Sequence, residues 1–373
     1  MESGLILSNK MNVGIFTIDT HCNYGNRLQN FALQSILKKI CNPVSVWWSC
    51  DYELFKKDQF SLKEKLKFVL NYKDYQKKIL HDDRIDAVKE YQIKKFSDQY
   101  INIRQISQLS ELYNEMYDAY VVGSDQVWNP LFWHNYDLYS KIMLLNFTEK
   151  RKIAYAASIG LYDFPKCYVN DFCKSLDSFD SISVREKRAS EIIKNLIGRD
   201  VPVLVDPTML LSAKEWSRIE FKPEWLKESK YLLTYFLGEV PHFIKKVAQE
   251  NNISIINLMD KKIINIYASR VEEFIFLIHH CDLFITDSFH GCVFSILFKK
   301  PFLVVNREEK GVPVMTCRID TLLDTFKLKD RYISFNSEAI DYDNVMNPDY
   351  SRIDEILFKE REKSNEFIRK SLL

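Results

Sequence analysis

The sequence predicts an α/β fold in which two Rossmann-like domains, each built on a parallel sheet, face each other across a cleft. Short apolar, β-rich runs alternate with amphipathic stretches along most of the chain, which is typical of parallel strands joined by crossover helices. The alternation starts again after Asp206 to Thr208. At 373 residues the chain is also long for one hydrophobic core.

The first predicted domain, residues 1–212, carries a long insertion at about 52–118 that we expect to be helical. Lysines recur there among Phe, Tyr and Leu. Two interpretations stay open: a solvated helical face, or a basic arm that rests on anionic lipid headgroups. The predicted strands are 12–18, 44–48, 118–124, 152–158, 180–184 and 201–206, and the predicted helices are 25–40 and 187–197.

The second predicted domain, residues 213–373, repeats the strand and helix alternation and closes with an amphipathic helix. Ligands of such sheets bind at the carboxyl ends of the strands. Its predicted strands are 230–237, 254–259, 282–287 and 301–305, and its predicted helices are 241–250, 271–280, 290–298, 318–327 and 351–373.

Composition narrows the class of partner and the compartment. Because 52 basic residues nearly balance 51 acidic ones, no global charge points to nucleic acid. The 8 cysteines lack CxxC spacing, so we expect free thiols in a reducing compartment. The start, MESGLILSNK, shows no signal-peptide pattern, and no apolar run reaches about 18 residues. We therefore expect a cytoplasmic protein, with peripheral contact at the inner face of the plasma membrane if the basic arm binds lipid.

The turn at Asp287, Ser288, Phe289, His290 and Gly291 lies where a predicted strand passes into a helix. Unpaired backbone N–H groups and the positive end of the helix dipole meet at such a turn, which suits a phosphate or a carboxylate. His290 is the side chain whose ordinary pKa suits proton transfer near neutral pH. The alternative is that Asp287 or Ser288 caps the helix and that His290 only packs.

Three other strand ends carry polar residues. The segment 21–34 offers Gly25 for close backbone approach and donors from Asn26, Arg27 and Gln29. The others are a segment with Ser124, Asp125 and Trp128, where Trp128 could stack on a sugar or fill the core, and the pair Arg185 and Glu186, which could be a surface ion pair.

Five segments, in this order, resemble motifs of the polysaccharide pyruvyl transferase family: NYGNRLQNFALQ, VVGSDQVWN, SVREKRAS, VLVDPTMLL and TDSFHG with FKKPF. The resemblance covers about residues 11–335. It implies a GT-B-like fold and transfer of the pyruvyl group of phosphoenolpyruvate (PEP) onto two hydroxyls of a sugar. The implied acceptors are capsule, exopolysaccharide or cell-wall saccharides, often on a lipid carrier.

The resemblance also implies roles for the candidate residues. His290 would be the acid or a phosphate ligand, Arg185 would pair with the PEP anion, and Asp125 would be the base for a sugar hydroxyl. PEP would be a donor substrate, and we expect no metal and no cofactor. The implied phosphate side adds Ser288, Gly291 and Arg318, and the implied acceptor side comprises Asn26, Arg27, Gln29, Ser124 and Trp128.

One position departs from the family pattern. Many members carry an arginine two residues before the histidine, where this chain has Ser288. We expect another basic residue to take over its role, and the candidates are Arg318, Arg307, Lys310 and Arg27.

Two other functions remain compatible with the sequence. A GT-B glycosyltransferase that uses a nucleotide sugar would have the same sheets and the same helix-terminus phosphate site. A saccharide-binding protein without turnover would keep the cleft, although binding alone seldom needs a histidine aimed at an anion site. The acceptor sugar, the position of the ketal and the oligomeric state do not follow from the sequence.

Overall fold

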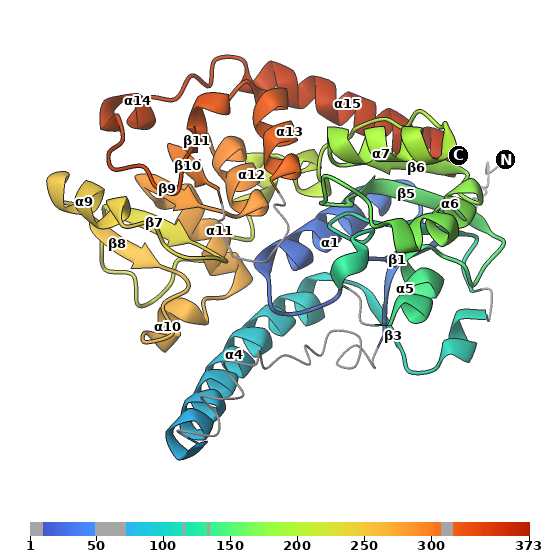
Figure 1. Ribbon diagram of the computed structural model, residues 1–373, viewed down its shortest axis with the longest axis horizontal. Helices are drawn as coiled ribbons and strands as arrows, with labels where there is room; N and C mark the ends of the chain where they lie inside the picture. Colours follow the sequence, from blue (N-terminus) through green and yellow to red (C-terminus); the bar gives the residue numbers. More distant parts are fainter. Residues whose placement is uncertain (1–9, 49–71, 114–115, 133–134, 307–315) are drawn as a thin grey trace, which may run out of the picture.

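The computed structural model describes residues 10–48, 72–113, 116–132, 135–306 and 316–373, and it contains two parallel-sheet α/β domains (Figure 1). The predicted fold of two α/β domains with parallel sheets is confirmed. The first sheet lies within residues 12–184 and the second within residues 231–333. The predicted boundary at residue 212 stays a prediction.

The first sheet has the strand order β3-β2-β1-β4-β5-β6, and each neighbouring pair is parallel. Crossover helices between the strands bury their apolar faces on it, as the alternating sequence pattern predicts. Its strands are β1 (Asn12–Phe16), β2 (Asn42–Trp48), β3 (Ile103–Ile106), β4 (Ala119–Val122), β5 (Arg151–Ala157) and β6 (Ser181–Val184). Its helices are α1 (Tyr24–Leu37), α4 (Tyr72–Tyr100), α5 (Tyr136–Met143), α6 (Val169–Asp177) and α7 (Lys187–Ile197), with short 3₁₀ turns η1 (Leu109–Tyr113), η2 (Pro130–Phe132) and η3 (Lys166–Tyr168).

The second sheet has the order β11-β10-β9-β7-β8 and is also parallel. A connection with η4 (Pro207–Leu210) and α8 (Ala213–Trp216) leads into it. Its strands are β7 (Tyr231–Tyr235), β8 (Ser254–Asn257), β9 (Leu283–Thr286), β10 (Phe302–Val305) and β11 (Tyr332–Ile333). Its helices are α9 (Phe243–Glu250), α10 (Ile264–Tyr267), α11 (Val271–His280), α12 (Phe289–Leu297), α13 (Cys317–Phe326), α14 (Tyr342–Met346) and α15 (Ile353–Leu372), with the turn η5 (Lys329–Arg331).

Two departures from the predicted strands lie in the first domain. The segment 201–206 is not a strand. It pairs with β6 at a single bridge, between Val203 and Val184, and Pro202 has no N–H with which to extend the pairing. The insertion contains the helix α4, as predicted, but also β3, which pairs with β2. The part of the basic arm at 52–71 lies outside the described residues.

Apolar packing joins the two domains. The Tyr24 ring of α1 stacks on Phe274 of α11 with centroids 4.4 Å apart. Trp216 of α8 contacts Phe31 of α1 at 5.6 Å and Phe294 of α12 at 5.0 Å between ring centroids. These rings belong to one buried cluster that includes residues of both sheets, so the carboxyl ends of the two sheets are held close together.

The C-terminal helix α15 is present, as predicted, and it runs from the second domain back to the first (Figure 1). Near its start, Asp354 pairs with Lys299 at 2.7 Å. At its end, Arg151 of β5 donates to the carbonyl oxygen of Leu372 at 3.0 Å. In the part of the chain that the structure describes, no helix is long and apolar enough to cross a membrane.

Candidate active site

A buried charge cluster lies where the two domains meet, and its centre is Asp206. The Oδ2 atom of Asp206 accepts hydrogen bonds from Arg185 Nη1 at 2.7 Å and from Ser124 Oγ at 3.0 Å. His290 Nε2 lies 3.6 Å from the same oxygen. Thr208 donates to Oδ1 through its N–H at 3.0 Å and its hydroxyl at 2.7 Å. The carboxylate therefore joins the ends of β4 and β6 to the helix α12.

The electrostatics of Asp206 follow from this surrounding. Burial alone would raise the pKa of its carboxyl group, but the interactions with His290, Arg185 and Thr208 outweigh burial and hold that pKa well below its ordinary range. Asp206 is 1% exposed, so the site contains a permanent negative charge that water does not screen. Sequence reasoning did not select Asp206 as a site residue. Its segment, VLVDPTMLL, was among the five that resemble family motifs, but the Asp-Pro-Thr turn looked like an ordinary connection between domains.

His290 occupies the first turn of α12, where the sequence placed it. Ser288 caps this helix by accepting from Gly291 N at 3.2 Å, and Asp287 accepts from Leu237 N at 2.8 Å. Ser288, rather than Asp287, is thus the cap. Asp206 faces the ring, so His290 has a polar neighbour as well as packing contacts, and its role in the reaction stays a prediction.

The structure brings together the turn that contains Gly25 and the turn that contains His290 and Gly291. A Cβ atom added to Gly25, at the start of α1, would lie 2.1 Å from His290 Nδ1. No side chain fits there, so glycine at this position lets the backbone of the first domain form a wall against the histidine of the second. The close approach predicted at Gly25 is present, and its partner is His290.

Arg185 is buried and is not the surface ion pair that its neighbour Glu186 suggested. Its Nη2 atom lies 3.3 Å from Asp125 Oδ1, and its guanidinium carbon lies 4.3 Å from the centre of the Phe289 ring. The carboxylate of Glu186 instead accepts from the N–H groups of Ile159 and Gly160, both at 2.9 Å. Arg185 therefore links the acidic pair Asp206 and Asp125, which fixes its orientation beside His290.

Asp125 lies in the turn after β4. Its Oδ1 atom also accepts from Gln126 N at 2.9 Å, and it is 7% exposed. Its neighbour Ser124 is fully buried, and its backbone N–H donates to Gln29 Oε1 at 3.1 Å. The same Gln29 amide donates from Nε2 to Thr17 Oγ1 at 2.7 Å. Gln29 therefore connects the turn after β4 to the end of β1 inside the protein.

The expectation that Trp128 stacks on a sugar is wrong, and its alternative, a core position, is what the structure has. The indole is completely buried and donates from Nε1 to the carbonyl oxygen of Met143 at 3.1 Å. The rings of Phe172 and Phe179 pack edge-on against it at 5.7 Å. The sequence pattern of a tryptophan after a buried strand is the same whether the side chain faces solvent or the core.

The other residues expected to contact the acceptor also have their contacts inside the protein. Arg27 is fully buried, donates to the carbonyl oxygen of Ile18 and lies 4.6 Å from the Trp47 ring centre. Gln29 is likewise fully buried. Direct contact of Arg27 or Gln29 with a sugar is therefore contradicted. Asn26 is 7% exposed, and its amide donates to Thr20 Oγ1 at 2.9 Å.

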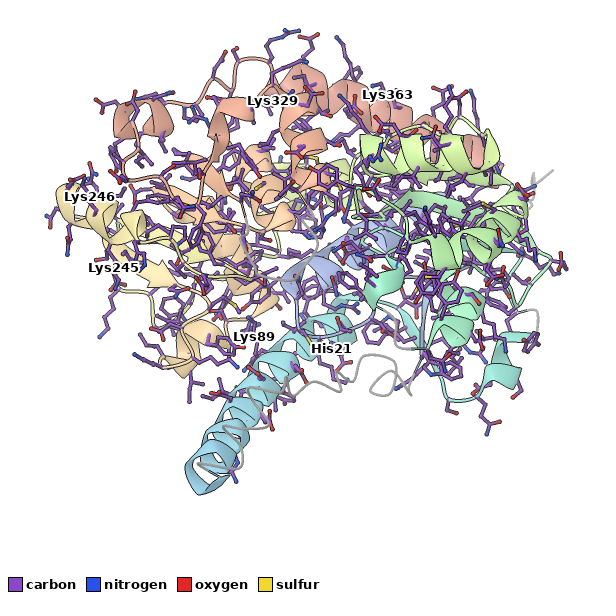
Figure 2. All side chains as sticks on the ribbon, viewed as in Figure 1. His21, Lys89, Lys245, Lys246, Lys329 and Lys363 are labelled. Carbon is purple, nitrogen blue, oxygen red and sulfur yellow. The ribbon has the colours of Figure 1, made fainter. Side chains whose placement is uncertain are left out.

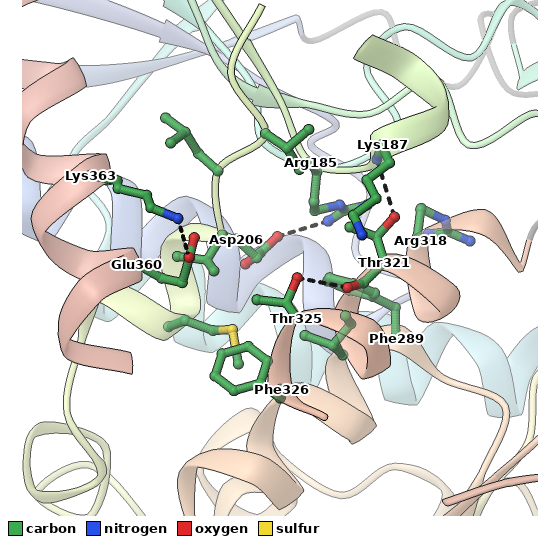
Figure 3. Close-up of a pocket in the computed structure, with 15 residues that line it drawn as sticks. Arg185, Lys187, Asp206, Phe289, Arg318, Thr321, Thr325, Phe326, Glu360 and Lys363 are labelled. Carbon is green, nitrogen blue, oxygen red and sulfur yellow. Dashed lines mark hydrogen bonds and ion pairs between the residues drawn. The ribbon is translucent and has the colours of Figure 1, made fainter. Parts of the chain in front are cut away.

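A cavity of about 190 Å³ opens beside the cluster (Figure 3). Arg318 lines it, and its guanidinium group has no hydrogen-bond or ion-pair partner among the residues that the structure describes. Burial and the nearby charge of Arg185 lower the pKa of Arg318 to about 10, which still leaves it charged near neutral pH. A half-buried cation that the described residues leave without a partner favours an anion beside it. The cavity is lined by Arg185, Lys187, Val203, Leu204, Val205, Asp206, Met209, Phe289, Arg318, Thr321, Leu322, Thr325, Phe326, Glu360 and Lys363.

Of the four basic residues considered as substitutes for an arginine at position 288, Arg318 is the one that the described geometry supports. Arg27 is buried against Trp47. Arg307 and Lys310 lie outside the described residues.

One group in the described part of the chain has the donor set of a metal site, and it lies elsewhere. Glu220, His279 and His280 bring their ligand atoms within 4.8 Å of one another. His279 and His280 lie in the last turn of α11, and Glu220 lies in the connection between α8 and β7. Because α11 precedes β9, this group is at the edge of the sheet opposite His290.

The sequence matches the profile of one protein family, described as polysaccharide pyruvyl transferase, over residues 23–309. The match takes in the turns that carry Gly25, Asp125, Arg185, Asp206 and His290. The chain belongs to the polysaccharide pyruvyl transferase family. The resemblance noted from the five sequence segments is thereby confirmed. No curated protein sequence matches the chain.

Solved structures with a distantly similar fold include nucleotide-sugar enzymes. UDP-GlcNAc 2-epimerase from Neisseria meningitidis is 10% identical, with a TM-score of 0.45 over 97% of this chain and 99% of that one. Anabaena Alr3699/HepE, in complex with UDP and glucose, is 11% identical, with 0.46 over 97% and 99%. Arabidopsis thaliana UGT89C1, complexed with UDP-L-rhamnose, is 10% identical, with 0.49 over 98% and 99%.

Proposed function

We propose that this family member transfers the pyruvyl group of PEP onto two hydroxyls of a sugar and releases phosphate. The observation that carries the proposal is the buried cluster of Asp206, Arg185 and His290 beside Arg318, whose Nε atom has no hydrogen-bond partner among the described residues. A proton carrier, an ionised carboxylate beside it and a cation in the adjoining cavity are what this reaction needs.

The proposed chemistry begins at the methylene carbon of PEP. His290 donates a proton to that carbon, which becomes a methyl group, and C2 becomes an oxocarbenium-like centre. A sugar hydroxyl adds to C2 and gives its proton to Asp125. Phosphate then leaves, and the second hydroxyl adds to C2 and closes the cyclic ketal. One of the two hydroxyl protons restores the acid, and the other leaves with phosphate, so atoms and charge balance.

Arg318 has the clearest proposed role in binding the donor. Its guanidinium group would pair with the phosphate or the carboxylate of PEP, in place of the arginine that many family members carry at the position of Ser288. Arg185 already has two carboxylate partners in the protein. We therefore assign it mainly to orienting Asp206 and Asp125, with its positive charge contributing to anion attraction over a longer range.

The volume of the cavity supports a small donor. Pockets for drug-sized ligands measure roughly 300–1,000 Å³, whereas the cavity at Arg318 measures about 190 Å³. A three-carbon phosphate ester fits within that volume. Use of a nucleotide sugar remains the alternative, and binding of a saccharide without turnover is the second one.

We further propose that the acceptor belongs to a capsule, an exopolysaccharide or a cell-wall polymer and is modified on its lipid carrier. The reaction would then take place in the cytoplasm, at the inner face of the plasma membrane. Peripheral contact through the basic arm would bring the enzyme to such an acceptor.

The test is incubation of the protein with PEP and a panel of lipid-linked and nitrophenyl sugars. We expect phosphate release that depends on both PEP and one class of sugar, with a matching gain in the mass of that sugar. Transfer from a nucleotide sugar in the parallel reaction, with PEP inert, would contradict the proposal.

A further inference from the structure

Lys89 of α4 is a buried lysine that the proposed reaction does not use (Figure 2). It is 3% exposed. Its ammonium group lies 4.5 Å from the ring centre of Tyr267, 5.0 Å from that of Tyr24 and 5.6 Å from that of Tyr235. The sulfur of Met259 lies 3.4 Å away. We call these four side chains around the ammonium group the tyrosine cage.

No carboxylate pairs with Lys89 in the described part of the chain. The nearby Asp86 is held by Lys261 at 2.7 Å and by the hydroxyl of Tyr267 at 2.5 Å. Burial lowers the pKa of Lys89 to about 8, although Asp86 and Cys22 oppose the effect. An unpaired buried charge is costly, and aromatic faces offset part of that cost because they attract cations. The lysine is therefore held by directional contacts with the rings rather than by an ion pair.

The tyrosine cage joins the two domains next to the catalytic histidine. Lys89 and Tyr24 come from the first domain, whereas Tyr235 and Tyr267 come from β7 and α10 of the second. The hydroxyl of Tyr24 donates to the carbonyl oxygen of Ser269 at 2.9 Å.

The residue after Tyr24 is Gly25, whose backbone forms the wall against His290. The contacts thus run without a break from Lys89 through Tyr24 and Gly25 to the ring of His290. Two consecutive residues of α1, Tyr24 and Gly25, therefore lie between the Lys89 side chain and the histidine.

We propose that Lys89 is a positioning residue that latches α4 to the second domain and keeps Gly25 against His290. The catalytic part of this inference rests on the proposed pyruvyl transfer. The latch itself does not, because it is a statement about how the domains are held. Its contribution is orientation: the ammonium group fixes three rings in place, and a neutral side chain of the same length would fill the space without doing so.

The decisive variant is Lys89→Met, which keeps the length and removes the charge. We expect kcat to fall about tenfold or more with the KM for PEP within about threefold, because misplacement of a catalytic group slows the chemical step more than it weakens binding. The melting temperature should stay at or above that of the wild type, since an unpaired buried charge is removed. A fall of kcat and melting temperature together would assign Lys89 a general structural role and overturn the proposal.

Lys95→Met is the matched control. Lys95 is on the same helix and lies 4.6 Å from the ring centre of Tyr91, but it is exposed and reaches no other element through this contact. Its kcat should equal that of the wild type. Lys89→Arg keeps a cation that stacks on rings and should recover most of the lost kcat. If Lys89→Met does not fold, Lys89→Leu replaces it.

Amide hydrogen exchange separates this inference from the proposed function. Without any substrate, Lys89→Met should exchange at least about threefold faster than the wild type at residues 24–30 and 267–270, and Lys95→Met should not. Unchanged exchange in Lys89→Met would overturn the latch even if PEP is the donor. If exchange rises but no variant and no wild type uses PEP, the latch stands and the proposed function falls.

Discussion

Replacing Asp206 by Asn removes one negative charge from the buried cluster and changes little of its shape. Asn keeps an oxygen that can accept from Thr208 or Ser124, but Arg185 loses its partner at 2.7 Å. Breaking a buried ion pair by removing one member costs about 3–5 kcal/mol. Because Asp125 still pairs with Arg185 at 3.3 Å, we expect the lower end, about 3 kcal/mol. For domains of about 150–250 residues, a loss of about 3 kcal/mol lowers the melting temperature by roughly 6–12 °C.

The pH dependence provides a second check on the same variant. The pKa of Asp206 in the folded protein lies below its ordinary value, which is about 3.9 in an unfolded chain. Its stabilising contribution is therefore complete above about pH 4 and is lost as the pH falls through the lower, folded-state pKa. The difference between wild type and Asp206→Asn should be full at pH 7 and should narrow below about pH 4.

Urea unfolding followed by circular dichroism measures both quantities. Asp324→Asn is the control, since Asp324 pairs with Lys187 and with Lys329 at the surface. Surface pairs contribute about 0–1 kcal/mol, so that variant should unfold almost like the wild type. If Asp206→Asn is as stable as the wild type at pH 7, the buried carboxylate does not stabilise the fold through Arg185 and His290.

Three further substitutions test roles in the proposed reaction. His290→Ala should lose transfer by about 10²-fold or more while its unfolding stays cooperative; near-native turnover would remove His290 from the chemistry. Arg318→Met should raise the KM for PEP about tenfold or more, because it removes one hydrogen bond to a charged group. The control Arg188→Met, which breaks the surface pair with Glu191, should leave the KM unchanged. Equal KM values in both variants would exclude Arg318 as the residue that binds the PEP anion. Asp125→Asn should leave PEP affinity by calorimetry within about threefold and slow transfer by about 10²–10⁴; lost PEP affinity would place the donor at β4 instead.

Much of the fold could be predicted because the determining signals are local. Alternation of apolar runs with amphipathic helices identified most strands of both sheets, and the Ser288 cap lies where a polar residue precedes an apolar helix. The strand β3 was missed because its sequence, IRQI, is short and half polar. Its place depends on pairing with β2, which is not a local property.

The site could be predicted only in part, for a physical reason. Helix starts and glycine turns reveal that His290 and Gly25 need special backbone positions, but not that they touch each other. Asp206 was not recognised because its importance comes from partners 21 and 82 residues away. For Trp128 and Lys89, the sequence shows the residue type but not its surroundings. Whether an aromatic or charged side chain faces solvent, core or another ring is decided by tertiary packing.

The most direct test of the central claim is transfer in deuterium oxide with the acceptor that the PEP assay identifies. If His290 protonates the methylene carbon of PEP with a solvent-exchanged proton, every sugar-bound ketal should carry one deuterium on its methyl group, and phosphate should appear in equal amount. Mass spectrometry of the product decides this. Phosphate release without a sugar-bound methyl group, or a ketal methyl group free of deuterium, would contradict the account.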